Sequence, residues 1–251
     1  MSPPPEQNNA VKRKVFHASA PLTRGRIIKR YKRFLADVVL DDGSQVTAHC
    51  PNTGSMRGCW EPDAPVQLSH SDNPKRKLAW TLERIDMGQG WVGVNTARTN
   101  AVVAEAVIEG KVPSLAGYEQ LKREVKFEVP GHPASRIDLM LSGGDRSDAL
   151  VEVKSVTLWD GERLRFPDAV SERATKHLKA LRHAVEVGFR GVILFALNRP
   201  EGACFSPAGD IDPVYAQTLA EVMEEGVEAY ALRIHHDDTG MRGEDLVPVE
   251  L

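Results

Sequence analysis

The chain has 251 residues, of which 41% are apolar, 27% charged and 6% aromatic, and its formal net charge is −3. This composition is typical of a folded protein of one large or two modest domains, and it excludes a disordered chain or a disulfide-stapled peptide. Three scattered cysteines, an amino terminus without a signal-peptide core and no stretch near the ~20 apolar residues of a membrane span predict a cytoplasmic protein without a membrane partner.

The charge is divided unevenly along the chain. Residues 1–95 hold 14 Lys+Arg and 9 Asp+Glu, a net +5, whereas the remainder holds 18 and 26, a net −8. Residues 11–33 carry nine basic side chains and no acidic one. Such a surface gains by releasing counterions from phosphate, which predicts nucleic-acid binding, with a solvated basic strand pair as the alternative. The candidate contacts in this part are Arg24, Arg26, Lys29, Arg30, Lys32, Arg33, Lys75, Arg76 and Lys77.

Short strands separated by turns follow the basic stretch. An alternating run at 34–40 leads through the turn 41–44 into a second run at 45–50, which predicts a hairpin. Further strands are expected at 65–69, 77–85 and 90–95. About five short strands in this length suit a small barrel of the OB type. We therefore expect a flexible extension over residues 1–14 and an OB-like, nucleic-acid-binding barrel over residues 15–95.

His49, Cys50 and Cys59 lie close together between these strands and raise the alternative of a zinc site. A fourth ligand and a close pair of cysteines are both missing from this segment. The pattern therefore favours a structural loop.

After residue 95 the pattern changes to alternating helices and strands. One helix is expected at 99–109, opening at Thr99 or Asn100, then three strands, a helix, a strand, a helix and a strand. These later elements are expected at 122–129, 136–141, 149–158, 171–187, 191–197, 212–225 and 227–234. The order predicts an αβββαβ domain over residues 96–234, followed by a loosely ordered acidic and polar tail over residues 235–251.

The second and third strands of this domain form the informative hairpin. If Asp138 lies opposite Glu152, one face is entirely apolar and the other gathers Asp138, Glu152 and Lys154. Paired side chains have Cβ atoms about 5 Å apart, and two carboxylates so close need a proton or a divalent cation between them. Mg²⁺, or Mn²⁺, is the expected cofactor, with Lys154 holding water or phosphate.

An ordinary cross-strand salt-bridge cluster is the alternative interpretation of these three residues. The order helix, three strands, helix, strand favours catalysis, because it is the core order of the PD-(D/E)XK nuclease fold. In that fold an Asp and an E-x-K on adjacent strands form the metal site. The pattern thus predicts phosphodiester hydrolysis assisted by a metal ion.

The whole chain also resembles the sugar fermentation stimulation proteins, from about Arg30 to about Tyr230. The resemblance rests on RYKRFLADV, HCPNTGSM, NPKRKL, RID, EVKSVTL, FPDAVSER and KHL, in matching order. It implies an OB-like domain, a PD-(D/E)XK-like domain, DNA binding without strong sequence preference, and a regulatory role in sugar (maltose) metabolism. Asp138, Glu152 and Lys154 match the nuclease-type motif of this family.

Further side chains are candidates for the same site. Glu105, alone in an apolar helix, is a candidate outer metal ligand, with an exposed helix face as the alternative. Asp168 is expected to cap the following helix, and lining the site is its alternative role. Arg173, Lys176 and His177 fall on the first turns of that helix and are candidate phosphate contacts, with solvated positions as the alternative.

Three functions follow from the sequence. The first is a DNA-binding protein whose second domain is a Mg²⁺-dependent nuclease. The second is a non-catalytic DNA-binding regulator that retains the nuclease fold as a scaffold. The third is a carbohydrate-binding module, which the basic stretch disfavours because a neutral ligand offers no phosphate for the cations to contact.

Overall fold

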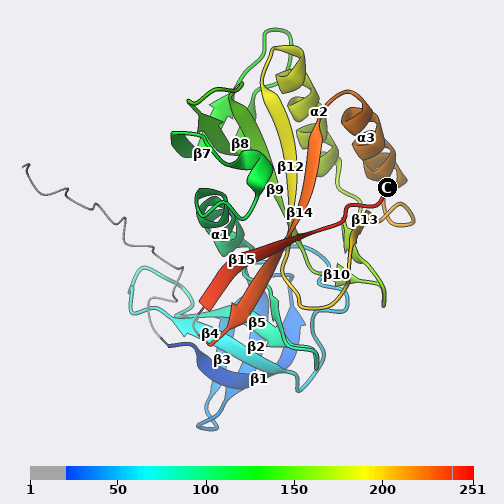
Figure 1. The fold of residues 1–251 in the computed structure, drawn as a ribbon. Coiled ribbons are helices and arrows are strands. Elements are labelled where there is room, and N and C mark those ends of the chain that lie inside the picture. Colours follow the sequence, from blue (N-terminus) through cyan, green and yellow to red (C-terminus); the bar gives the residue numbers. More distant parts are fainter. Residues whose placement is uncertain (1–20, 239) are drawn as a thin grey trace, which may run out of the picture.

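A computed structural model describes residues 21–238 and 240–251, which form a barrel followed by an α/β domain (Figure 1). The expected extension at residues 1–14 and the expected first residues of the barrel, 15–20, lie outside this range. None of the described helices combines the length and apolar character that crossing a membrane requires.

The first part of the chain closes into a small barrel, as predicted for an OB-like domain. The sheet order is β3-β2-β1-β4-β5-β6, and a parallel pairing of β3 with β5 closes it. The strands are β1 (Thr23–Tyr31), β2 (Leu35–Leu40), β3 (Gln45–His49), β4 (Pro65–His70), β5 (Trp80–Asp86) and β6 (Trp91–Gly93). Apolar side chains that alternate along these strands fill the interior, among them Ile27, Val38, Leu68 and Leu82.

The predicted hairpin of β2 and β3 is confirmed. Val38 pairs with Val46, and the turn between the strands places Gly43 at φ +84°, which a glycine adopts without strain. The Asp42 carboxylate accepts a hydrogen bond from the Ser44 amide at 2.9 Å. The turn residues therefore set the strand register that the alternation requires.

The two cysteines in and after the loop that follows β3 are packed in the barrel core. Cys50 and Cys59 are free thiols buried in the barrel core. The Cys59 thiol donates to the Thr157 carbonyl at 3.3 Å, and burial raises the pKa of this thiol. A buried, protonated thiol packs as a small apolar side chain.

The second domain has the predicted helix and strand order around a six-stranded sheet ordered β15-β14-β12-β9-β8-β7. Its helices are α1 (Thr96–Ile108), η1 (Pro113–Leu115), α2 (Glu172–Glu186) and α3 (Pro213–Glu224). Its sheet strands are β7 (Gln120–Phe127), β8 (Ser135–Ser142), β9 (Ala149–Val156), β12 (Arg190–Leu197), β14 (Glu228–Asp237) and β15 (Gly240–Val247). A small second sheet contains β10 (Leu158–Trp159), β11 (Leu164–Phe166) and β13 (Phe205–Pro207).

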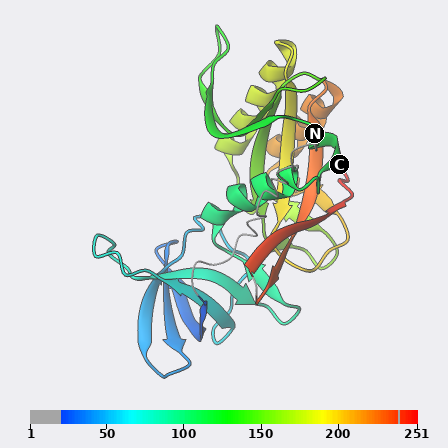
Figure 2. The same cartoon turned by 60° about the vertical axis from the view of Figure 1, so that its left-hand side comes forward.

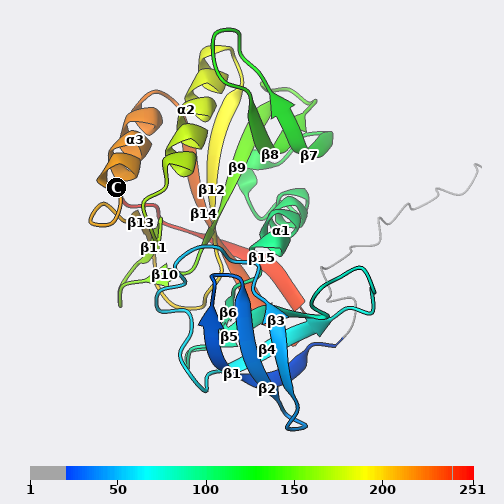
Figure 3. The ribbon, with the colours of Figure 1, turned by 180° about the vertical axis from the view of Figure 1, so that it is seen from behind.

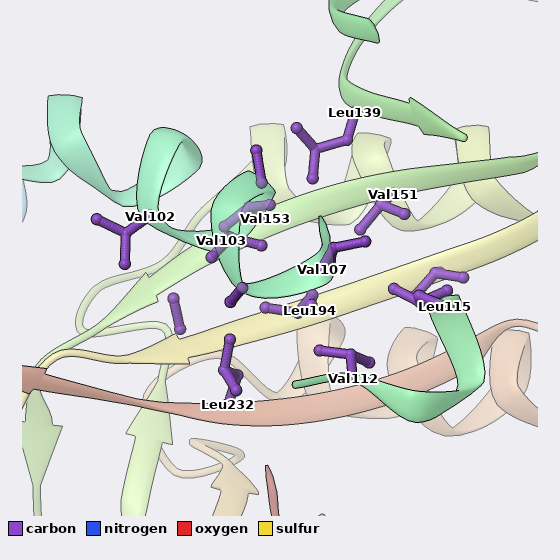
Figure 4. Close-up of a cluster of buried hydrophobic side chains, with 14 of the residues drawn as sticks. Val102, Val103, Val107, Val112, Leu115, Leu139, Val151, Val153, Leu194 and Leu232 are labelled. Atoms are coloured by element: carbon purple, nitrogen blue, oxygen red, sulfur yellow. The ribbon is translucent and has the colours of Figure 1, made fainter. Parts of the chain in front are cut away.

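Helices cover both faces of this sheet (Figures 1 and 3). On one face, Val102, Val103 and Val107 of α1 pack on Val151 and other sheet residues (Figure 4). On the other face, α2 and α3 cover a second cluster that is built around β9 and β12. Both strands are buried on both faces, and β12 is accordingly a nearly continuous apolar run. The charged residues of β9 therefore face a helix rather than water.

Two boundaries differ from the sequence-based expectation. The helix expected to open at Thr99 or Asn100 begins at Thr96, where the Asn95 side chain accepts from the Ala97 amide as the cap. The expected loose tail is wrong, because β14 continues to Asp237 and β15 pairs with it as an edge strand (Figure 2). The Gly243 backbone lies close to Ala106 of α1, so pairing and helix packing order a segment whose composition is polar.

The barrel and the α/β domain are in direct contact. The Gly93 amide donates to the Asn198 carbonyl at 2.8 Å, and the Arg84 guanidinium donates to the Asp237 carbonyl at 2.7 Å. A Cβ atom at Gly93 would collide with the His236 ring, so only glycine permits this approach of β6 to β14. Backbone groups of the two domains thus satisfy one another, which fixes the barrel relative to the sheet.

Candidate functional site

The site begins where β8 separates from β9. The pairing of Leu139 with Val151 confirms the predicted register. This is the last pair of the two strands, so the neighbouring residue Asp138 is not paired with β9. The Val153 amide, which would otherwise bond the neighbouring strand, donates to Asp138 Oδ2 at 2.8 Å. The Asp138 carboxylate therefore replaces a backbone partner at the point where the two strands diverge.

A second contact fixes the same carboxylate from α1. The Asn100 side-chain amide donates to Asp138 Oδ1 at 2.7 Å. Ile137 belongs to the apolar cluster under α2 and α3, whereas Leu139 and Leu141 of the same strand belong to the cluster under α1. The apolar face that was expected for the hairpin is thus divided between the two clusters.

Glu152 and Lys154 lie on the face of β9 that α2 covers. The Lys154 ammonium donates to Glu152 Oε1 at 2.6 Å, and the two side chains are only 10% and 3% exposed. His177 of α2 contacts the same oxygen through Nδ1, and this Nδ1 lies 3.1 Å from the Lys154 ammonium. The solvated cross-strand cluster considered as the alternative does not describe this buried arrangement.

The two carboxylates have opposite electrostatic environments. Burial and the negative charge of Glu152 raise the pKa of Asp138 to about 6, although the Val153 amide and Lys154 act in the opposite direction. Burial alone would raise the pKa of Glu152 too, but the hydrogen bond with His177 and the charge of Lys154 outweigh it and lower that pKa. Glu152 is therefore ionised at neutral pH, whereas the pKa of Asp138 is raised to about 6.

Two buried oxygens beside this network have no hydrogen-bond partner among the described residues. One is Glu152 Oε2 and the other is the hydroxyl of Tyr215, which is fully buried under α3. Burial and the charges of Glu152 and Asp212 raise the pKa of Tyr215 well above its usual value. A buried carboxylate oxygen without a partner is costly, and a cation or a water molecule is the species that satisfies it.

The third predicted metal ligand, Glu105, occupies a half-buried position on α1. A group of three His, Cys, Asp or Glu side chains whose ligand atoms all lie within 4.8 Å of one another is found among the described residues, but it does not include Glu105, Asp138 or Glu152. The structure thus places Lys154 in contact with Glu152 and brings Asp138 near enough for its charge to interact with both. It does not gather Glu105 with the two acids within the distance given above. Its role as an outer ligand stays a prediction.

Asp168 does not cap α2 as expected, because the Ser171 side chain accepts from the Ala174 amide as the cap. The Asp168 carboxylate instead accepts from the Ser55 hydroxyl at 3.0 Å and from the Met56 amide at 3.1 Å. A Cβ atom on Gly54 would lie 2.7 Å from this carboxylate, which requires glycine there. Asp168 therefore joins the segment before α2 to the loop of residues 49–56.

Arg30 clamps that same loop from the barrel side. Its guanidinium donates to the carbonyls of Asn52 and Gly54, each at 3.0 Å, and to those of Ser55 and Arg33. Both terminal nitrogens of the Arg30 guanidinium are thus used within the fold, and its predicted contact with nucleic acid stays a prediction. The loop 49–56 thus links the β1–β2 turn to the start of α2 by direct contacts.

The other basic residues of β1 are exposed and carry acidic partners. Arg24 faces Asp238 at 3.7 Å, and Lys29 faces Asp37 at 3.5 Å. Arg26 lies 3.2 Å from an Asp63 carboxylate oxygen in the same way. Exposed ion pairs contribute about 0–1 kcal/mol, so a phosphate group can replace these partners at little cost.

The remaining predicted contacts lie at loops and on α2. Lys32 and Arg33 are exposed in the β1–β2 turn, and Arg173 and Lys176 are exposed on the first turns of α2. The β4–β5 loop presents three more exposed cations, Lys75, Arg76 and Lys77. These seven cations remain candidate phosphate contacts.

His177 differs from its neighbours, because it points at Glu152 instead of solvent. A sequence signal for this exists: His177 lies on the stripe of Ala174, Leu178 and Leu181, which is the buried face of α2. Tyr215 carries the same signal, because it lies on the stripe of Thr218, Leu219 and Val222, which is the buried face of α3. Its burial depends on the packing of α3 against the sheet.

Comparisons with known proteins agree with this architecture. The profile of the SfsA N-terminal OB domain matches residues 28–94, and that of the sugar fermentation stimulation protein RE domain matches residues 97–240. Sugar fermentation stimulation protein homologs of Magnetococcus marinus and Geobacter sulfurreducens are 54% and 50% identical, over 83% and 85% of this chain and 88% and 89% of theirs. The solved structure of Pyrococcus furiosus SfsA in complex with Ca²⁺ matches with a TM-score of 0.82 and 26% identity, covering 94% of this chain and 98% of that one.

Proposed function

This chain belongs to the sugar fermentation stimulation protein family, and on that premise we propose that it binds DNA without strong sequence preference and hydrolyses phosphodiester bonds with Mg²⁺ or Mn²⁺. The observation that carries the proposal is Glu152 Oε2, a buried carboxylate oxygen without a partner among the described residues. It belongs to a carboxylate whose charge raises the pKa of the nearby Asp138. A divalent cation bound by both groups would relieve both costs.

The donor set fits such an ion. Mg²⁺ binds hard oxygens in proteins, usually one or two carboxylates with water and phosphate completing the shell. Asp138 accepts one hydrogen bond on each oxygen, and a carboxylate offers about four lone-pair sites, so both oxygens keep a free position. Asp138 and Glu152 would therefore hold the ion. The Ca²⁺ complex of the related Pyrococcus furiosus protein supports divalent binding in this family.

The neighbouring side chains have distinct roles in this proposal. When bound, a divalent ion supplies Lewis-acid stabilisation of the phosphate and a more acidic water. Lys154 uses one donor on Glu152 Oε1, and its ammonium has two further donors for a phosphate oxygen or the attacking water. His177 holds the same Oε1 atom and thereby keeps Oε2 free for the ion. His177 is thus a positioning residue.

The exposed cations supply the DNA contacts of the proposal. Direct contacts lead from the β1–β2 turn, with Lys32 and Arg33, through the loop 49–56 to Asp168. Asp168 shortly precedes α2, which carries Arg173 and Lys176 on its surface and His177 in the site. A phosphate backbone that follows these cations would pass the carboxylates. A cytoplasmic location is part of the proposal, because the three cysteines are free thiols.

The test is a divalent-dependent nuclease assay on linear, nicked and single-stranded DNA. Wild-type protein is expected to cut in Mg²⁺ or Mn²⁺, and Asp138→Asn and Glu152→Gln are expected to lose about 10²–10⁴-fold in rate while still binding DNA. Asp145→Asn, on the exposed turn of the same hairpin, is the matched control and should retain activity. Equal residual cleavage by all four proteins would show a contaminating nuclease and overturn the proposal.

A non-catalytic regulator linked to sugar (maltose) metabolism is the second candidate, and one observation favours it. Glu152 is almost fully buried, and its Oε1 atom is held by Lys154 and His177. If DNA stays intact in both metals and binding persists, the regulator is supported. Calorimetric titration separates the two: equal Mg²⁺ heats for wild type and Glu152→Gln would exclude the metal site.

A further inference from the structure

A second cluster of metal-ligating side chains lies away from the carboxylate site. The ligand atoms of His132, His183 and Glu186 all lie within 4.8 Å of one another. Over residues 21–238 and 240–251, this is the group of three His, Cys, Asp or Glu side chains that meets this distance. The proposed hydrolysis makes no use of these residues.

The fold assembles this cluster from two elements. His183 and Glu186 are three residues apart near the end of α2, so both point from one side of the helix. His132 comes from the connection between β7 and β8, where its amide donates to the Val129 carbonyl at 3.0 Å in a tight turn. The views in Figures 1 and 3 both show this connection beside the end of α2.

Packing holds the two elements together beneath the cluster. The Phe127 ring of β7 meets the Phe189 ring, just after α2, edge to face at a centroid distance of 5.7 Å. The imidazole rings of His132 and His183 have centroids 3.5 Å apart. The positions of the two histidines are thus set by the surrounding fold, so little rearrangement is needed to bring their nitrogens to one ion.

A guanidinium beside the cluster is paired with two carboxylates, one of which is the proposed ligand Glu186. Arg182 lies 3.9 Å from Glu186 and 3.5 Å from Glu225. Because Arg182 has Glu225 as a second partner, Glu186 can turn to an ion without leaving the guanidinium unpaired.

We propose that His132, His183 and Glu186 bind one divalent transition-metal ion of the zinc class, which ties the β7–β8 connection to the end of α2. Two imidazoles and one carboxylate are the donors that zinc accepts, whereas Mg²⁺ prefers oxygen ligands only. Zinc usually takes four ligands, so with three protein ligands at this accessible place a water molecule would be the fourth. In this proposal the ion is a structural link between the two elements. Because β8 follows this connection directly and carries Asp138, the link would also steady the strand that leads to the carboxylate site.

The experiment separates this site from the carboxylate site by using an Asp138→Asn/Glu152→Gln parent, stripped of metal with EDTA. Calorimetric titration with ZnCl₂ in excess Mg²⁺ should give one zinc ion per chain. Adding His132→Ala or His183→Ala should weaken binding by more than the ~10–100-fold typical of losing an outer-shell partner. His70→Ala, an exposed histidine of the barrel, is the control and should bind as the parent does.

Two results would overturn the proposal: no stoichiometric zinc binding by the parent, or unchanged affinity in both histidine variants. His132 is exposed in a connection, so His132→Ala tests the site without disturbing the helix core. Circular dichroism confirms that each variant is folded. As a second readout, zinc should raise the melting temperature of the parent and of His70→Ala, and leave that of His132→Ala unchanged.

Discussion

The barrel and the α/β domain use charged residues in opposite ways. On β1, Arg24, Arg26 and Lys29 are exposed and pair with acids, of which the partner of Lys29 is half-buried. On β9, Glu152 and Lys154 are buried beneath α2 and depend on each other and on His177. Arg24 and Arg26 of β1, like Glu152 and Lys154 of β9, lie two residues apart, so their spacing in the sequence does not distinguish the two cases.

This difference predicts how each region responds to change. Exposed pairs are weak, screened by salt and nearly independent, which suits reversible contact with a polyanion. Buried charges are costly and coupled, and removing one leaves its partner without compensation. Such a cost is typical of a functional site rather than of a stabilising device.

The largest effect is expected for Glu152→Ala, which leaves the Lys154 ammonium buried without its carboxylate. We expect the free energy of unfolding to fall by about 3–5 kcal/mol, measured by urea denaturation. Asp63→Ala removes the exposed partner of Arg26 and should cost at most about 1 kcal/mol. Similar losses for the two variants would contradict the contrast between the regions.

Asp138→Asn is expected to stabilise the metal-free protein at neutral pH. Burial and Glu152 raise the pKa of Asp138 from 3.8 to about 6, so between these values the folded state holds a proton that the unfolded state has released. Stability therefore falls as pH rises through this window, and the variant avoids a loss of order 1–3 kcal/mol above pH 6.

The measurement is the difference in unfolding free energy between wild type and Asp138→Asn across pH. The difference should vanish near pH 4 and be largest above pH 6. Burial lowers the pKa of His236 to about 3, which opposes this trend in each protein and cancels in the difference. A pH-independent difference would show that Asp138 ionises normally. Added Mg²⁺ should restore wild-type stability above pH 6 and leave the variant unchanged.

Within the barrel, Arg30→Ala should differ sharply from Arg33→Ala. Arg30 donates to four backbone carbonyls around the loop 49–56, and hydrogen bonds to a charged group contribute about 1.5–3 kcal/mol. Arg33 is exposed, and its loss should change stability by less than about 0.5 kcal/mol. Thermal denaturation measures both. Equal stability of the two variants would contradict the role of Arg30 in holding the loop 49–56.

The smallest effects are expected in DNA binding by the exposed cations. Lys32→Ala and Arg33→Ala should each weaken binding to all sequences alike. Each should also reduce the slope of log affinity against log salt by about 0.9 on duplex DNA. Fluorescence anisotropy over a salt series measures the slope, with Lys179→Ala on the exposed face of α2 for comparison. A slope near zero in the wild type would remove nucleic acid as a partner.

Much of the site was predictable because the hairpin of β8 and β9 is local. The alternation of Leu139, Leu141 and Val151 with polar residues sets the faces, and the turn at Gly143 and Gly144 sets the register. The OB-like barrel and the αβββαβ order followed from runs of the same kind. Local spacing determines these features, so they need no knowledge of distant contacts.

Other features depended on contacts between residues far apart in the chain. Asp168 pairs with Ser55, 113 residues away, and its spacing before α2 suggested a cap instead. Arg30 had the composition of a phosphate contact and is a clamp on its own domain. Segment 240–247 has the composition of a solvated tail, and composition does not reveal that this segment pairs with β14.

By itself, the sequence determined two modules of opposite charge, the order of their elements and the strand register that brings Asp138 near Glu152, because periodicity and turn chemistry act over a few residues. Only the tertiary structure decided which charges are buried. Packing of α2 on β9 turns His177 toward Glu152 and excludes water, whereas β1 lies at the surface and keeps its cations solvated. Burial, rather than residue type, makes one set of charges a candidate reaction centre and the other a binding surface.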